Sequence, residues 1–123
     1  MSVKVLIAST RYTPEVSLNE DTNELVFSGR SFPDNSGRFY EEVSSALTFE
    51  NDKDSITLQF MFEYVNSSSI ISILKLIREI EERLDRGDVK IHWHYDSEDD
   101  EMMNIGKDIE RIVTCKFQYR ARV

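Results

Sequence analysis

The fold of this chain is decided by residues 55–84, which read SITLQFMFEYVNSSSIISILKLIREIEERL. Residues 55–64 alternate between apolar and polar side chains, with an apolar row running from Ile56 to Tyr64, which is the pattern of a strand with one buried face. From Ile70 onward the apolar residues recur every three to four positions, as on an amphipathic helix, and Gly87 is placed to end that helix. The segment therefore predicts a strand followed directly by a helix.

The rest of the chain shows the same two patterns, alternation for strands and a repeat of three to four residues for helices. We expect the last strand to lie at a sheet edge, because its outward row is charged. Ile112 and Ala121 fall on the expected apolar rows of the last helix and the last strand. The first two strands should pair as a hairpin after the turn-rich residues 19–23. Further strands are expected at residues 3–7, 24–28, 89–95 and 115–121, and further helices at residues 38–49 and 102–112.

Strands that alternate with helices indicate an α/β fold, with a mixed or largely parallel sheet of about five strands. A sheet covered on both faces would need almost continuously apolar strands, but three strands here have a polar second face. We therefore expect one domain, residues 1–123, with helices packed mainly on one face of the sheet. The expected core residues are Ile56, Leu58, Phe60, Phe62, Ile91, Trp93, Phe117 and Tyr119 from the strands and Leu47, Ile73, Leu74, Ile77 and Ile109 from the helices.

The composition excludes several classes of protein. With 123 residues and 40% hydrophobic content, the chain has the composition of a folded domain. Its net charge of -8 opposes binding to nucleic acid or anionic membranes and favours protein partners. No apolar run approaches the roughly 20 residues of a membrane helix, and residues 1–10 do not resemble a signal peptide. The single cysteine, Cys115, cannot form an intramolecular disulfide, so we expect a cytoplasmic protein.

The serine-rich residues 66–69 are the first candidate site. They lie where a strand ends and a helix begins, close to unpaired backbone N–H groups and the positive end of the helix dipole. Two interpretations follow. One serine caps the helix, which the spacing alone favours, or one serine accepts a phosphate, which this position would tolerate well.

A metal-dependent enzyme is the alternative that the sequence offers. His92 and His94 share one strand face and could supply two metal ligands, with Glu63 or Cys115 as the nearest third ligand. No third ligand is locally spaced, and Cys115 points to the apolar side, so solvated histidines are favoured. The acidic residues 96–101 lack the glycine and ligand spacing of a calcium loop. We therefore expect no catalytic residue, no metal and no cofactor.

Four segments resemble the SiaC family of regulatory phosphoproteins, in the same order along the chain. They are residues 12–16, 28–35, 64–69 and 93–96, which read YTPEV, SGRSFPDN, YVNSSS and WHYD. Residues 66–69 are also similar to the phosphorylated turn of STAS-type anti-sigma-factor antagonists, with Ser67 aligned to their phosphoserine. Two positions depart from these patterns: the SiaC family commonly has threonine where this chain has Ser67, and Ser69 replaces the glycine of the STAS turn.

The resemblance implies a STAS-like fold and a non-enzymatic role in a bacterial partner-switching circuit. A cognate kinase would phosphorylate the protein, a metal-dependent phosphatase would reverse this, and one phosphorylation state would bind an effector. In the characterised branch of the family, that effector is a diguanylate cyclase. A constitutive scaffold without phosphate turnover is the third alternative.

Parallel strands would bring the loops at residues 30–35, 66–69 and 95–100 to one rim of the sheet. We expect Ser67 to be the phosphoacceptor, with Ser68 as the backup, and Asn66 to fix the turn so that the Ser67 hydroxyl projects outward. The added negative charge would then release a partner, and the alternative is that a basic partner recognises the phosphate. The expected partner-binding residues are Arg30, Phe32, Asp34, Asn35, Asn66, Ser68, Ser69, Tyr95 and Asp96.

Overall fold

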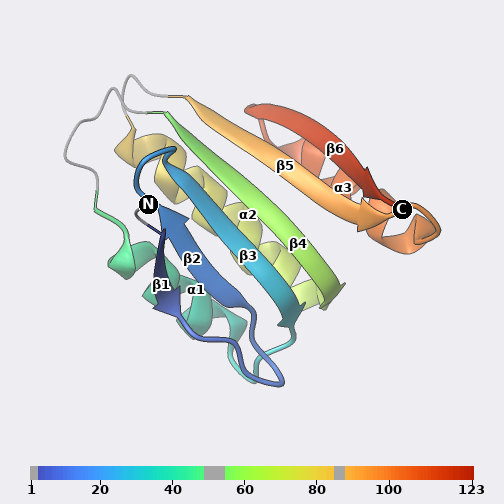
Figure 1. Ribbon diagram of the computed structural model, residues 1–123, viewed down its shortest axis with the longest axis horizontal. Coiled ribbons are helices and arrows are strands. Elements are labelled where there is room, and N and C mark those ends of the chain that lie inside the picture. The colour runs from blue at the N-terminus through green and yellow to red at the C-terminus, as the bar shows by residue number, and fades with distance from the viewer. Residues whose placement is uncertain (1–2, 49–54, 85–87) are drawn as a thin grey trace.

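The computed structural model describes residues 3–48, 55–84 and 88–123. Within these ranges the chain forms six strands and three helices (Figure 1). In chain order they are β1 (Val3–Ile7), β2 (Glu15–Asn19), β3 (Glu24–Ser31), α1 (Ser36–Ala46), β4 (Ile56–Val65), α2 (Ser67–Arg83), β5 (Val89–Asp96), α3 (Asp100–Ile112) and β6 (Lys116–Arg122).

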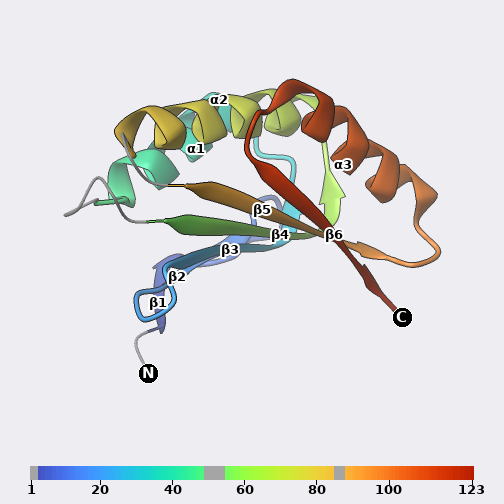
Figure 2. The same cartoon turned by 90° about the horizontal axis from the view of Figure 1, so that it is seen from above.

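All six strands belong to one mixed sheet whose order follows the sequence. β1, β2 and β3 are antiparallel neighbours, whereas β3, β4, β5 and β6 run parallel, each joined to the next through one helix. Figure 2 shows α1, α2 and α3 on the same side of the sheet, with the other face open. The expected α/β fold with helices on one face is confirmed, with six strands in place of about five. β6 is an edge strand, as its charged row predicted.

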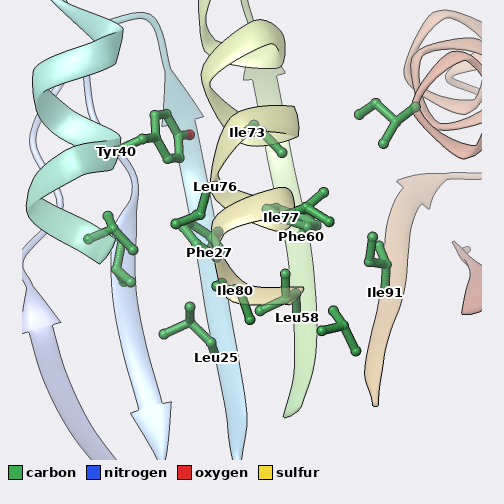
Figure 3. Close-up of a cluster of buried hydrophobic side chains, with 14 of the residues drawn as sticks. Leu25, Phe27, Tyr40, Leu58, Phe60, Ile73, Leu76, Ile77, Ile80 and Ile91 are labelled. Atoms are coloured by element: carbon green, nitrogen blue, oxygen red, sulfur yellow. The ribbon is translucent and has the colours of Figure 1, made fainter. Parts of the chain in front are cut away.

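The core lies between the sheet and the helix layer, where side chains of β3, β4 and β5 meet those of α1 and α2 (Figure 3). Phe27 stacks on Phe60 with their ring centroids 4.8 Å apart. α3 approaches β5 closely because Gly106 faces the Trp93 ring, and the indole N–H of Trp93 donates a hydrogen bond to the Met102 carbonyl oxygen at 2.9 Å. All the expected core residues are buried except three that are partly buried, namely Leu74, Phe117 and Tyr119.

The expected hairpin between residues 3–7 and 24–28 is wrong. β1 pairs with β2, and β2 in turn pairs with β3. β2 was not predicted because only two of its residues, Val16 and Leu18, are large and apolar. Such an alternation is too short to identify a strand. The turn between β2 and β3 ends at Asn23, whose φ of 55° is the left-handed conformation that asparagine tolerates.

All three helices begin earlier than their apolar patterns indicate, and α3 begins at Asp100 in place of residue 102. α1 covers Ser36–Ala46 in place of residues 38–49, and α2 begins at Ser67, ahead of its first apolar residue. In both cases an asparagine at the preceding position caps the helix, so polar residues fill the first turn. The expected end of α1 at Phe49 and the expected stop at Gly87 lie outside the described residues.

Tyr64 does not lie on the buried row of β4. Gly29 pairs with Phe62 and Arg30 pairs with Tyr64, so Glu63 is an extra residue that forms a bulge. The bulge reverses the alternation beyond Phe62, which leaves Tyr64 exposed and buries the following valine. The expected apolar positions Ile112 and Ala121 are also exposed, since one ends α3 and the other lies on the edge strand β6.

Candidate functional site at the carboxyl ends of β3 and β4

The candidate site lies where β3 and β4 end and α1 and α2 begin. The two strands are parallel, so their carboxyl ends meet at the same edge of the sheet (Figure 1). Asn35 caps α1 by accepting a hydrogen bond from the Arg38 amide at 3.0 Å, and Asn66 caps α2 by accepting one from the Ser69 amide at 2.9 Å. Two capped helix N-termini therefore open onto one rim.

Buried hydroxyl groups join the two strand ends. The Ser31 hydroxyl donates to the Ser69 hydroxyl oxygen at 2.8 Å, and Ser69 donates to the Ser31 carbonyl oxygen at 3.1 Å. Because the Ser31 proton is used in this way, the Tyr40 hydroxyl is the donor in its 2.8 Å bond with Ser31. Burial raises the pKa of the Tyr40 hydroxyl, which keeps this donor protonated. The Asn66 amide also bonds to the Ser31 carbonyl oxygen at 3.0 Å.

The serines at positions 67, 68 and 69 have three different environments. Ser69 is fully buried in the network just described, so the expectation that it contacts a partner directly is wrong. Ser68 is exposed, but its hydroxyl is 2.9 Å from the Ser36 hydroxyl and 3.3 Å from the Asn66 side-chain oxygen. The hydroxyl of Ser67 is exposed and has no hydrogen-bond partner in the part of the chain that the structure describes. We call this group, Ser31, Ser36 and residues 67–69, the serine rim.

An aromatic cluster borders the serine rim. The ring of Phe32 lies edge-on between Tyr12, at a centroid distance of 5.2 Å, and Tyr64, at 5.5 Å. The Phe32 amide also donates to the Tyr12 carbonyl oxygen at 2.8 Å. Tyr12 is 51% exposed and Tyr64 is 49% exposed. Beside them, an open hollow of about 310 Å³ is lined by Arg30, Phe32, Glu63 and Tyr64.

The other expected rim residues divide into two groups. Arg30 lies 3.5 Å from the Glu63 carboxylate, and Asp34 is exposed next to the cap Asn35, so these residues do lie at the rim. Tyr95 and Asp96 lie at the end of β5, and among the described residues they have no hydrogen bond or ring contact with residues 66–69. The Asp96 carboxylate instead accepts from the backbone of the turn that leads into α3.

Several residues of the site were not predicted from the sequence. Ser31 and Ser36 fall within or beside the SGRSFPDN segment, but no local signal distinguishes them from loop serines. Tyr12 belongs to a different loop and reaches the rim only through the folding of the β1–β2 connection. Tyr64 fits the apolar row of its strand in the sequence. It lies at the surface because of a bulge that the sequence pattern does not predict.

The two histidines lie on the open face of the sheet, away from the helices. His94 Nε2 is 2.6 Å from the Gln59 side-chain oxygen, and the Gln59 amide in turn donates to Glu24. Partial burial and then the neighbouring positive charges of Arg122 and Arg120 lower the pKa of His94.

The remaining expected ligands do not join the histidines. Glu63 pairs with Arg30, and Cys115 packs against the core below the helices. Burial, and to a lesser extent Glu81, raises the pKa of the Cys115 thiol to about 11, so the group is a protonated thiol. Within residues 3–48, 55–84 and 88–123, no three His, Cys, Asp or Glu residues are arranged to hold a metal ion.

Comparison with known families identifies the family of the chain. The model of the SiaC family, described as regulatory phosphoproteins, matches residues 7–122. The chain belongs to the SiaC family. The resemblance of the four sequence segments is therefore confirmed over nearly the whole chain, and the protein is a member of a family of signalling proteins.

Solved structures of SiaC proteins have the same fold. The crystal structure of apo-SiaC from Pseudomonas aeruginosa is 25% identical, with a TM-score of 0.75, and the match covers 98% of this chain and 100% of that one. A crystal structure of the diguanylate cyclase SiaD in complex with its activator SiaC, from the same organism, contains a chain that is 23% identical, with a TM-score of 0.79, covering 94% of this chain and 98% of that one. A search of curated proteins finds no match. None of the described helices is both long and apolar enough to cross a membrane.

Proposed function

We propose that this chain is a non-catalytic bacterial regulator whose Ser67 accepts a phosphate, and that this phosphate controls the binding of an effector protein at the serine rim and the aromatic cluster. The observation that carries the proposal is the contrast among three consecutive serines. Ser69 is buried and doubly hydrogen-bonded, Ser68 shares its hydroxyl with Ser36, and Ser67 alone of the three presents an exposed hydroxyl without a partner among the described residues.

The position of Ser67 suits a phosphate. Asn66 takes the capping position, so Ser67 is the first residue of α2 and its side chain is not used as a cap. A phosphate at a helix N-terminus is stabilised by the helix dipole and by the unpaired backbone N–H groups of the first turn. The modified protein would therefore keep its fold, and the effect of the phosphate would fall on whatever binds the rim.

The aromatic cluster supplies the apolar part of the proposed binding surface. Exposed tyrosines beside an arginine are the residue types that most often dominate the binding energy of protein interfaces. A phosphate adds a charge of about -1.5 to -2 next to this surface. An effector packed over the rim would have to desolvate or repel that charge, so phosphorylation releases the effector in this proposal.

The proposed effector class rests on similarity to a solved complex. SiaC is described as the activator of the diguanylate cyclase SiaD in the solved complex. By similarity, we propose a diguanylate cyclase as the effector of this chain, with a cognate kinase that adds the phosphate and a metal-dependent phosphatase that removes it, in the cytoplasm.

Phosphosite mapping on the protein purified from its own cells tests the acceptor. Intact-mass measurement followed by fragment sequencing should find one phosphate, located on Ser67. Ser67→Ala should lose the phosphate, whereas the matched control Ser68→Ala should keep it. Phosphate on Ser68, or undiminished phosphate in the Ser67→Ala protein, would refute the assignment.

Binding measurements test the switch itself. Unmodified protein and protein carrying phosphoserine at position 67 should be titrated by calorimetry into the diguanylate cyclase of the same organism. We expect binding by the unmodified form and at least tenfold weaker binding by the phosphorylated form, with Ser67→Asp between them because a carboxylate carries less charge. Equal binding by all forms would show that the phosphate is not a switch for this effector.

A further inference from the structure

The open face of the sheet carries a second surface, which the proposed switch does not use. In β5 and β6, polar residues alternate with residues packed against the core, so they lie on the face of the sheet opposite the helices. The pairing of the two strands brings these polar residues side by side, in the order Lys90 with Lys116, His92 with Gln118, His94 with Arg120 and Asp96 with Arg122. We call this group the basic ribbon, and its cationic residues are Lys90, Lys116, Arg120 and Arg122.

The cations of the basic ribbon are not engaged in ion pairs with the described residues. None of its four cationic side chains forms a salt bridge in the described part of the chain. Asp96, at the carboxyl end of β5, is the single carboxylate that the two strands contain. Such a cluster stands out in a chain with 23 acidic and 15 basic residues.

Two polar atoms of the basic ribbon are buried without a partner. They are His92 Nδ1 and Arg122 Nε, neither of which has a hydrogen-bond partner among the described residues. Buried polar atoms are nearly always hydrogen-bonded in folded proteins, so an unpaired one requires an explanation. The guanidinium group of Arg122 can also donate to an acceptor that approaches this face, and the His92 imidazole can offer either a donor or an acceptor.

The strands next to the basic ribbon carry few charges on this face. Glu24 on β3 accepts from Gln59 on β4, and Gln59 in turn bonds to His94 on β5. These side chains therefore use one another's hydrogen-bonding groups and separate the basic ribbon from β3. At its far end the ribbon is bounded by the acidic residues 96–101.

We infer that the basic ribbon binds an acidic segment of a protein partner, independently of Ser67. Charge complementarity selects the class of partner, because four unpaired cations on two adjacent strands match a short run of carboxylates. A long polyanion such as nucleic acid or a membrane surface would extend beyond the ribbon onto the acidic turn at residues 96–101, which repels it. The segment recognised is therefore short, acidic and part of a protein.

A peptide of ten glutamates, labelled with a fluorophore, is the direct probe. We expect saturable binding to the full chain by fluorescence anisotropy at low salt, weakening as salt is raised. In backbone amide spectra of the isotope-labelled protein, the peptide should shift the resonances of β5 and β6 and leave those of the serine rim unchanged. Shifts confined to another surface, or no binding at low salt, would overturn the inference.

Charge reversal supplies the matched variants. Lys116→Glu/Arg120→Glu should weaken peptide binding about tenfold or more, since two surface ion pairs become repulsive. Lys75→Glu/Arg78→Glu, which makes the same charge change on the exposed side of α2, should leave it within about twofold. If the first variant does not fold, Lys116→Gln/Arg120→Gln replaces it, with a smaller loss in the same direction. Equal losses on both surfaces would show that only net charge matters, and would refute a local site.

Competing occupants are tested with the same protein. Single-stranded oligothymidine of equal charge and vesicles containing phosphatidylserine should bind more weakly than the peptide. Tighter binding of either would replace the protein partner with nucleic acid or membrane. Sedimentation tests whether a second copy of this chain occupies the ribbon. We expect no self-association that is lost in the Lys116→Glu/Arg120→Glu variant, and such a loss would make the second copy the occupant. Ser67→Ala should bind the peptide as the unchanged protein does, which separates this surface from the proposed switch.

Discussion

The two faces of the sheet are built from neighbouring residues of the same strands, yet they perform different tasks. On β4, Phe60 is buried beneath α2, while the adjacent Met61 lies on the open face. The covered face consists of packed apolar side chains, and the open face carries mostly polar side chains, some of which bond to one another. The difference indicates that stability resides mainly on one face and that the other is free for recognition.

Truncation of adjacent residues on β4 should show the largest contrast. Phe60→Ala removes a ring that stacks on Phe27 and contacts Trp93, and should lower the free energy of unfolding by about 3–5 kcal/mol. Met61→Ala on the open face should cost less than about 1 kcal/mol. Urea unfolding of the two variants measures both values. Comparable losses would mean that the open face is as important for stability as the covered one.

The close approach of α3 to β5 should be the next most sensitive feature. A methyl group at Gly106 would lie 2.5 Å from Cδ1 of Trp93, whose ring is buried and held by its bond to the Met102 carbonyl. Gly106→Ala should therefore destabilise the protein by about 1–3 kcal/mol, although alanine is the better helix former. Thermal unfolding would show the change. A stabilised variant would indicate that the helix moves away from the sheet at little cost.

Ser69 and Ser67 allow the same comparison between a buried and an exposed side chain. Ser69→Ala removes one hydroxyl from the buried network and leaves one of the two O–H protons of Ser31 and Tyr40 without an acceptor, so we expect a loss of about 1–3 kcal/mol. Ser67→Ala should change stability by less than about 0.5 kcal/mol, because the side chain is exposed. Urea midpoints of the two variants distinguish them. Equal destabilisation would show that Ser67 also has a structural role.

Protonation of His94 on the open face should have the smallest effect on stability. Partial burial, followed by the charges of Arg122, Arg120 and His92, lowers the pKa of His94 in the folded protein. Below the ordinary histidine pKa of about 6.5, the unfolded chain therefore binds a proton more readily than the folded protein does. Stability should be retained above pH 6.5 and should fall as the pH drops from there toward the lowered pKa. His94→Gln should show a smaller loss between pH 7.5 and pH 5.5 in urea midpoints. Parallel losses in both proteins would assign the effect to other groups.

Most of the fold was predicted correctly because its buried rows are long. In β4 and α2 the apolar residues repeat often enough that only one period fits, and the structure follows it. Prediction was wrong where the pattern was short or interrupted. β2 has too few apolar residues to be recognised, and the bulge at Glu63 moves Tyr64 to the other face without changing the apparent alternation.

The candidate site was predictable in part. The sequence located residues 66–69 at a strand–helix junction, but the serine cap that the spacing favoured is wrong, because Asn66 caps α2. The environments of the serines depend on contacts from other elements: Ser31 bonds to Ser69 in the interior, and Ser36 bonds to Ser68. Tyr95 and Asp96 were expected at the same rim because β5 is parallel to β4, yet the hydrogen-bonded register of these strands stops at the pair Phe60 and Trp93, before their ends.

The sequence by itself determined the α/β class, the one-sided packing of helices and the position of the serine segment, because periodicity and capping preferences are local properties of the chain. Only the tertiary structure decided which serine hydroxyl is free, which aromatic rings gather beside it and where unpaired cations collect on the open face. These features depend on strand register and on contacts between residues up to 38 positions apart, such as Ser31 and Ser69. Local pattern carries no information about such pairs, since their energies exist only once the strands are aligned.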